Sequence, residues 1–222
     1  TVKEFKGTDP FFGVNPARGI IIYYQLPTLT DSLEVTMEFR NEKGVVVNTF
    51  SSKKIVEPKF DAPQLSKDKG INRFVWDMRH QSLNRVPDVM IEGDKRGHIA
   101  SPGNYTVTIT MVDEEQTIEC AILANPLYDV TAEEYQEYHM YMSQMELVYN
   151  TMLENLNELN KMTGQLKSVI KELDPEKHSE LLAIGDSLVE RIRNWDEEIV
   201  QRKTKVYDDV ENFPNKFTAQ YL

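Results

Sequence analysis

One short run of the sequence, GINRFVWDMRH at residues 70–80, holds residue types that are common in hydrolase active sites. Asp77 is an acid, His80 is a base, and Arg79 lies between them. Trp76, next to the acid, supplies an aromatic platform. Catalysis by these side chains requires that they converge on one point within hydrogen-bonding reach. Whether they can do so depends on the element that carries them.

The same run has the pattern of a β-strand, in which alternate side chains point to opposite faces. Phe74, Trp76 and Met78 then share one face, while Asp77 and Arg79 lie together on the other. The histidine that follows leaves the strand and alternates away from both. We therefore expect Trp76 to be a core residue and Asp77 to pair, at the strand end, with Arg79 or the backbone. No catalytic residue is assigned to this run.

A second candidate site lies in the long connection 81–102, which contains EGDKRGH. Glu92, Asp94 and His98 could bind a metal ion, but their spacing matches neither a zinc site nor an EF-hand loop. His139 has no second His or Cys three or four residues further on. We assign no metal ligand, and whether the loop binds a metal or another ligand stays open. Because connections of this length are usually functional or disordered, we expect the loop to touch a neighbour.

Tyr23 and Tyr24, together with Trp76, raise the alternative of a carbohydrate-binding platform. Such a platform needs exposed coplanar rings, whereas strand alternation places Tyr24 and Trp76 inside. The single cysteine, Cys120, lies in an alternating apolar pattern and is expected to be a buried structural thiol. The sequence contains no nucleotide-binding glycine motif and no serine-hydrolase or metalloprotease motif. We therefore expect a chain that is not an enzyme and holds no cofactor.

The first half of the chain alternates apolar and polar residues with period two, which predicts half-buried strands. Turns that contain Gly, Pro and charged residues separate these strands, and no helical pattern intervenes before residue 130. The expected strands are residues 20–26, 33–39, 45–50, 74–78, 105–111 and 118–122. This pattern predicts an immunoglobulin-like antiparallel β-sandwich over residues 1–127, with an N-terminal arm at 1–15.

The period changes in the second half. Thr131 and Glu134 form a capping box that starts a helix, and apolar residues then recur every three or four positions over about five heptads. Asp174 and Pro175 signal a second helix after a short connection, which predicts antiparallel neighbours. Residues 128–222 are thus expected to form an αα-hairpin with a truncated C-terminal helical tail, and the fold class is segregated α+β. The predicted core residues are Phe74, Trp76 and Tyr105 in the sandwich and Met145, Met152, Leu156, Leu188 and Trp195 in the hairpin.

The 222-residue chain carries a formal net charge of −11, with 25 basic and 36 acidic residues. This balance disfavours a nucleic-acid partner, because such a partner requires clustered Lys and Arg. No apolar run approaches the roughly 18 residues that a membrane span needs. The chain begins at Thr1 without Met, so we expect a leader or a preceding domain to have been removed.

The order of motifs resembles that of a known family. NPARGIIIYYQL, KGINRFVWDMR, RGHIASPGNYTVTITM and YDDVENFPNK follow one another along the chain. Their order is similar to the C-terminal region of bacterial secreted proteins with sortilin-type, BNR-repeat β-propellers, which are often labelled glycosyl hydrolases. The pairing of NRFVWDMR with PGNYTV also resembles the immunoglobulin-like domain of flagellar hook-capping proteins. The propeller of the family is missing here, and no catalytic residue can be carried over.

This resemblance implies export to the periplasm or the cell surface. We expect a non-catalytic accessory module of a larger exported β-propeller protein, which mediates interdomain or protein–protein contacts. Its partners would be the N-terminal propeller of the same parent chain or another protein, with self-association through the helical hairpin as a further expectation. Two alternatives stay open: a carbohydrate-binding module, and a fragment of a glycoside hydrolase whose active site lies in a missing domain.

Overall fold

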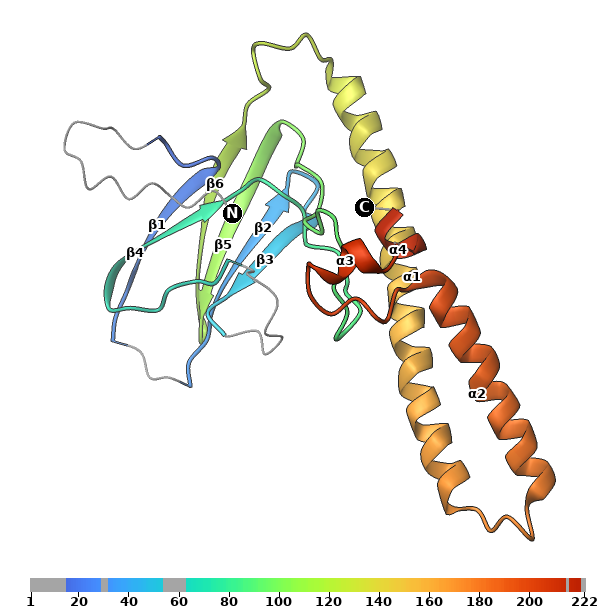
Figure 1. Ribbon diagram of the computed structural model, residues 1–222. Coiled ribbons are helices and arrows are strands. Elements are labelled where there is room, and N and C mark those ends of the chain that lie inside the picture. Colours follow the sequence, from blue (N-terminus) through green and yellow to red (C-terminus); the bar gives the residue numbers. More distant parts are fainter. Residues whose placement is uncertain (1–14, 29–31, 54–62, 215, 221–222) are drawn as a thin grey trace. The chain divides into compact units, whose positions relative to one another are not determined.

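The protein is an α+β chain in which antiparallel sheets precede long helices (Figure 1). The computed structural model describes residues 15–28, 32–53, 63–214 and 216–220. Contacts divide the chain into two compact units. Unit 1 comprises Thr1–Gln81 and His98–Gln136, and unit 2 comprises Ser82–Gly97 and Glu137–Leu222.

This division differs from the boundary expected at 127/128. Residues 82–97, which lie inside the expected sandwich by sequence, belong to the helical unit. The start of the first helix belongs to the sheet unit up to Gln136. The expected N-terminal arm at 1–15 lies outside the described residues except for Asn15.

Unit 1 contains six described strands, and all pairings between them are antiparallel. Period-two alternation of apolar residues accounts for each of them, with one face of the strand on the core. The strands are β1 (Ile20–Leu26), β2 (Val35–Asn41), β3 (Val46–Ser51), β4 (Gly70–Trp76), β5 (Gly103–Met111) and β6 (Glu114–Ile122). One sheet has the order β1-β4 and the other the order β3-β2-β5-β6.

Both sheets contribute inward-facing residues to one apolar core. Trp76 on β4 is fully buried, and its ring centroid lies 4.2 Å from that of Phe39 and 5.7 Å from that of Tyr105. The indole Nε1 donates a hydrogen bond of 3.0 Å to the carbonyl oxygen of Arg79, so its polar atom has a partner inside the core. Phe74 is buried as well. The three aromatic residues predicted for this core are therefore all buried.

Two backbone positions fix where β1 begins and where β4 ends. Gly19 precedes β1 with a φ of 137°, and a Cβ at this position would collide with the carbonyl oxygen of Trp76. Only glycine allows the two chains to approach so closely there. Met78 has a φ of 59°, so β4 ends at Trp76. The expectation that Met78 continues the inward face of this strand is wrong, because the left-handed residue turns the chain out of the strand.

The β5–β6 hairpin is tighter than its sequence indicates. Met111 pairs with Glu114, so only Val112 and Asp113 connect the two strands. Residues 114–117, which the expected strands 105–111 and 118–122 leave between them, belong to β6 instead. Val112 is 58% exposed and has a φ of 56°, which is unfavourable for a β-branched side chain. The hairpin tip therefore holds local backbone strain.

Helix α1 (Ala132–Glu172) begins at the predicted capping box. The backbone N–H of Glu134 donates to Thr131 Oγ1 at 3.2 Å, and the backbone N–H of Thr131 donates to Glu134 Oε2 at 2.8 Å. This reciprocal pair satisfies two amide donors that the first helical turn leaves without an internal partner. In the described part of the chain, no helix combines the length and the apolarity that crossing a membrane requires.

Helix α2 (Ser179–Ile199) begins later than the Asp-Pro pair indicates. The carbonyl oxygen of Asp174 accepts hydrogen bonds from the N–H groups of Lys177 and His178, which closes a separate turn before the helix. The described chain continues through two short helices, α3 (Asp209–Asn212) and α4 (Phe217–Gln220).

The buried residues of α2 differ from the two that the sequence predicted. Gly185 and Asp196 are buried on α2, whereas Leu188 and Trp195 are 43% and 40% exposed. The assignment of Leu188 and Trp195 to the core is therefore wrong. A Cβ on Gly185 would lie 2.8 Å from Cδ1 of Ile170 on α1, so the glycine permits a close approach that a larger residue would prevent.

The core of unit 2 combines the middle of α1 with residues from the 82–97 segment. Leu156 is fully buried, Met152 packs against the cluster, and Met145 is half-buried. The buried members of the cluster are Leu83, Val86, Val89, Ile91, Tyr149, Leu153, Leu156 and Val200. The long connection of the sheet unit is thus a part of the helical core.

Candidate functional site

A groove of about 700 Å³ opens in unit 1 between β1 and the inward face of β6. Its β1 wall carries Ile22, Tyr24 and Leu26, and its opposite wall includes Ile109 and Ile118. Apolar side chains that alternate along two facing strands produce this lining, because residues i and i+2 of a strand share one face. The groove has the size and the apolar character of a binding site.

The groove exists because the smaller sheet does not extend over β6. Val107 on β5 is 2% exposed, but its cross-strand partner Ile118 on β6 is 52% exposed. The two side chains lie on the same face of the sheet, since they are directly opposite each other. Among the described strands, nothing pairs with β1 on the side away from β4. A third strand beside β1 would cover the part of β6 that is now open.

The outer face of the β1-β4 sheet is also apolar. Ile21, Tyr23 and Ile71 are 42%, 65% and 77% exposed, and Ile21 lies opposite the half-buried Val75. An edge strand of seven residues with apolar side chains on both faces and no charge is unusual in a free protein. This strand and its groove together form the candidate interaction surface.

The two edges of the larger sheet are protected. The free edge of β6 carries Glu115 and Glu119, which disfavour pairing with another copy of the same strand. The edge of β3 is covered, because the N–H of Gln81 donates to Val47 O at 3.0 Å and Asn48 Nδ2 donates to Arg79 O at 2.9 Å. The edge of β1 has neither form of protection in the described part of the chain.

Charge in the groove is confined to one end. Glu114 of β6 and Lys69, which precedes β4, both line the groove near Leu26. Burial raises the pKa of the Tyr24 hydroxyl, which donates a hydrogen bond of 2.6 Å to Ser66 O and therefore stays neutral. Burial also raises the pKa of the Cys120 thiol, as expected for a structural cysteine rather than a nucleophile.

Two side chains of the suspected catalytic run have structural partners. Asp77 Oδ1 accepts a hydrogen bond of 3.3 Å from the backbone N–H of Arg79, which caps the end of β4. The His80 ring stacks on that of His98 with 3.9 Å between centroids, and the His80 N–H donates to the His98 carbonyl. Asp77 is thus a backbone partner at a strand end, one of the two outcomes that alternation predicts.

The candidate metal ligands of the 81–102 connection belong to two different units. Both carboxylate oxygens of Asp94 accept hydrogen bonds from the Arg96 guanidinium, at 2.9 and 2.8 Å, on an exposed surface. Glu92 is exposed in the same segment, whereas His98 is 3% exposed and belongs to unit 1. The pKa of Lys95 is lowered to about 8 by burial and by the nearby Arg85.

The 82–97 segment is attached to α1 by polar contacts as well as by its apolar residues. The N–H of Asn84 donates to Asn150 Oδ1 at 2.8 Å, and the Asn84 amide donates to Glu154 Oε1 at 2.8 Å. One turn further along α1, Asn157 Nδ2 donates to the carbonyl oxygen of Arg85 at 2.8 Å. Sequence analysis predicted contact with a neighbour and missed that the neighbour is a helix of the same chain.

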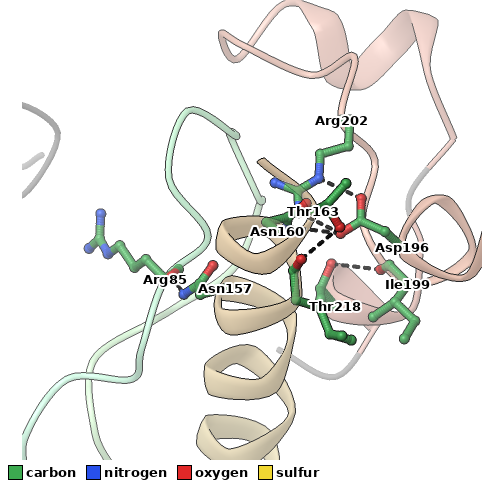
Figure 2. A network of polar contacts seen from close by, with 9 residues as sticks. Arg85, Asn157, Asn160, Thr163, Asp196, Ile199, Arg202 and Thr218 are labelled. Carbon is green, nitrogen blue, oxygen red and sulfur yellow. Dashed lines mark hydrogen bonds and ion pairs between the residues drawn. The ribbon is translucent and has the colours of Figure 1, made fainter. Parts of the chain in front are cut away.

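A buried ion pair secures the far end of α2 (Figure 2). Asp196 is 7% exposed and accepts hydrogen bonds from Arg202 Nε at 2.7 Å and from Arg202 Nη2 at 2.5 Å. Asn160 on α1 donates a third bond to Asp196 at 3.1 Å. Beside this network, Thr218 Oγ1 donates to Ile199 O at 3.0 Å. These contacts hold α2 against α1 and the C-terminal segment, and we assign them a structural role.

Of the interaction surface, the sequence singled out Tyr23 and Tyr24, as candidates for a carbohydrate platform, and not the isoleucines around them. A signal for them exists in the run Ile20, Ile21 and Ile22, which places apolar side chains on both faces of one strand. Strands of this kind are typical of sheets that are covered on both sides. The chain matches no family model, no curated protein and no solved structure.

Proposed function

We propose that this chain is a non-catalytic interaction module that binds another polypeptide through the β1 side of unit 1. The observation that carries this proposal is the uncharged β1 strand, which is apolar on both faces and borders an apolar groove of about 700 Å³. Exposed apolar surface of this extent is costly in water and is typical of binding surfaces.

The finer description of the fold belongs to the same proposal. Two antiparallel sheets with one shared core support an immunoglobulin-like sandwich, in which a further strand beside β1 would complete the smaller sheet. The short connection between α1 and α2, together with the Asn160–Asp196 contact, supports an antiparallel helical hairpin.

The resemblance to secreted sortilin-type proteins suggests which protein the partner is. In this proposal the chain is an accessory part of an exported β-propeller protein, and the surface around β1 contacts the propeller or a second exported protein. The apolar outer face, with Ile21, Tyr23 and Ile71, fits a lasting contact of this type, because such interfaces are more hydrophobic than transient ones.

The two alternatives have less support. A carbohydrate platform requires several exposed rings, and of the three candidates only Tyr23 is exposed, since Tyr24 and Trp76 are buried. For a hydrolytic fragment, the only acid of the suspected run, Asp77, is engaged by the backbone of Arg79. Retardation on polysaccharide affinity gels, or turnover of chromogenic glycosides that an Asp77→Asn variant loses, would restore these alternatives.

Photo-cross-linking in the cells that produce the protein tests the proposal. The probe p-benzoylphenylalanine replaces Tyr23, and the matched control places it at Tyr128, which is 67% exposed against 65% for Tyr23 and belongs to the same unit. We expect a discrete cross-linked protein from the Tyr23 site and none from the Tyr128 site. Equal labelling at the two sites, or none at Tyr23, would contradict the proposed function.

Self-association through the helices is a second candidate, which one observation favours. On α2, Leu181, Ile184, Leu188 and Trp195 are between 40% and 66% exposed. A stripe at three- and four-residue spacing fits a second helix. Light scattering at increasing concentration should then show a dimer that Leu188→Glu dissociates. A monomer over the full concentration range would exclude it.

A further inference from the structure

We infer that the groove of unit 1 binds an extended segment of another polypeptide, which adds as a strand to the edge of β1 that no other described strand pairs with and places alternate apolar side chains against β6. This inference rests on the proposed function and specifies the form of the partner. It is carried by three features of unit 1: the edge, the groove, and the position of the charges.

The edge supplies the backbone hydrogen bonds. Every second residue of an edge strand directs its N–H and C=O away from the sheet, so the seven residues of β1 offer three or four such positions. No proline interrupts Ile20–Leu26 and no charged side chain repels an incoming chain. Addition of a strand at such an edge is a recurrent mode of peptide recognition.

The groove supplies the sites for side chains. A strand beside β1 would lie in the plane of the smaller sheet, and its inward side chains would face β6 across the groove. Farther along the same face of β6, Cys120 and Ile122 pack against the core of unit 1, so the open part is lined by Ile118 together with Ile109 and Met111 of β5. These residues contact apolar side chains at every second position of the bound segment, and polar residues at the positions between them remain in water.

The charges select the partner. Glu114 and Lys69 lie at the mouth of the groove near Leu26, and Glu115 and Glu119 lie on the other face of β6, so these three carboxylates outweigh the positive charge of Lys69. A segment with Lys or Arg at the end that meets Glu114 is therefore favoured over a neutral or acidic one. A second copy of the chain is disfavoured, because each copy carries a net charge of −11 and the acidic β6 strand.

The test measures fluorescence anisotropy of the full 222-residue chain with labelled seven-residue peptides, the length of β1. The patterned peptide begins with Lys and alternates Val or Ile with Thr. A scrambled peptide has the same composition with its apolar residues contiguous, and a third peptide has Glu in place of Lys. We expect the patterned peptide to bind at least about tenfold more tightly than the other two.

Two matched variants locate the site. Ile118→Glu places a charge on the groove floor at a position that is already 52% exposed, so folding is retained, and Ala121→Glu places the same charge on the opposite face of β6. We expect Ile118→Glu to weaken binding of the patterned peptide at least about tenfold and Ala121→Glu to change it less than about twofold. Circular dichroism verifies that both variants fold.

Several results would overturn the inference. These are absence of binding by the patterned peptide, equal binding of the scrambled one, and equal loss in the two variants. Binding that appears only after removal of residues 1–14 would assign the groove to the chain's own segment. A dimer that Ile118→Glu dissociates would assign it to a second copy. Cross-linking at Tyr23 without discrimination between the peptides would leave the proposed function standing and remove strand addition alone.

Discussion

Loss of the Asp196 charge should destabilise the helical unit by about 2–3 kcal/mol. Asp196 accepts two hydrogen bonds from Arg202 and one from Asn160, and its side chain is 9% exposed. In Asp196→Asn the shape is retained, but an amide group faces the donors of Arg202. Removing one partner of a buried pair costs about 3–5 kcal/mol. The Arg202 side chain is 28% exposed and can regain water, so we expect a cost at or just below the lower end of that range.

A double-mutant cycle isolates the pair. Free energies of unfolding are measured by urea denaturation, with helical circular dichroism as the signal, for Asp196→Asn, Arg202→Met and the double variant. We expect a coupling energy of about 1.5–3 kcal/mol. The control pair is Glu190 and Arg193, whose side chains are 66% and 60% exposed at 3.5 Å, and its coupling should stay below about 0.5 kcal/mol. Similar coupling in the two cycles would refute the reasoning that burial makes the Asp196 contact strong.

Three further predictions concern the two cores and the hairpin tip. Trp76→Ala should destabilise unit 1 by about 3–5 kcal/mol in thermal unfolding, because the side chain is fully buried, and an unchanged melting temperature would contradict this. Val112→Asn should stabilise unit 1 by about 1 kcal/mol, since Asn tolerates the φ of 56° better than Val; lower stability in urea would show that the tip is not strained. The folded-state pKa of Lys95, about 8, lies below its unfolded value, so the folded state loses the proton first and the stability of unit 2 should rise from pH 8 towards 10. Tyr149, whose pKa is raised to about 12, lowers stability only above about pH 10. Urea midpoints should therefore increase over this range, and Lys95→Met, but not Lys167→Met, should remove the increase.

Local patterns predicted most elements of this fold, because the forces that make a strand or a helix begin act over a few residues. Alternation located β1, β2, β3 and β5 to within about two residues at each end. The capping box placed the start of α1, since Thr131 and Glu134 satisfy each other's amides without help from the rest of the chain. The bounds of β4 were predicted less well: the strand begins at Gly70, four residues before the expected start, and it ends at Trp76 because Met78 has a left-handed φ that its residue type does not indicate.

The sequence did not reveal the groove, because the exposure of β6 depends on how far the opposite sheet extends and not on the sequence of β6. The sequence of β6 predicts an apolar inward face whether or not another strand covers it. Ile118 is exposed only because the sheet opposite has two described strands, and that number follows from pairing between distant segments. The three isoleucines of β1 indicate that both faces of this strand are buried by other groups, but they do not indicate which groups these are.

By itself, the sequence determined where the period changes from two to about 3.6 and that Phe74, Trp76 and Tyr105 belong to the core of unit 1. The tertiary structure decided which elements share a core. It placed 82–97 with the helices, because Leu83, Val86, Val89 and Ile91 are buried against the middle of α1. It also buried Gly185 and Asp196 of α2 in place of the predicted Leu188 and Trp195. The pattern of apolar residues does not predict this buried face. Gly185 is buried because it has no side chain to prevent close approach, and Asp196 is buried because Arg202 compensates its charge.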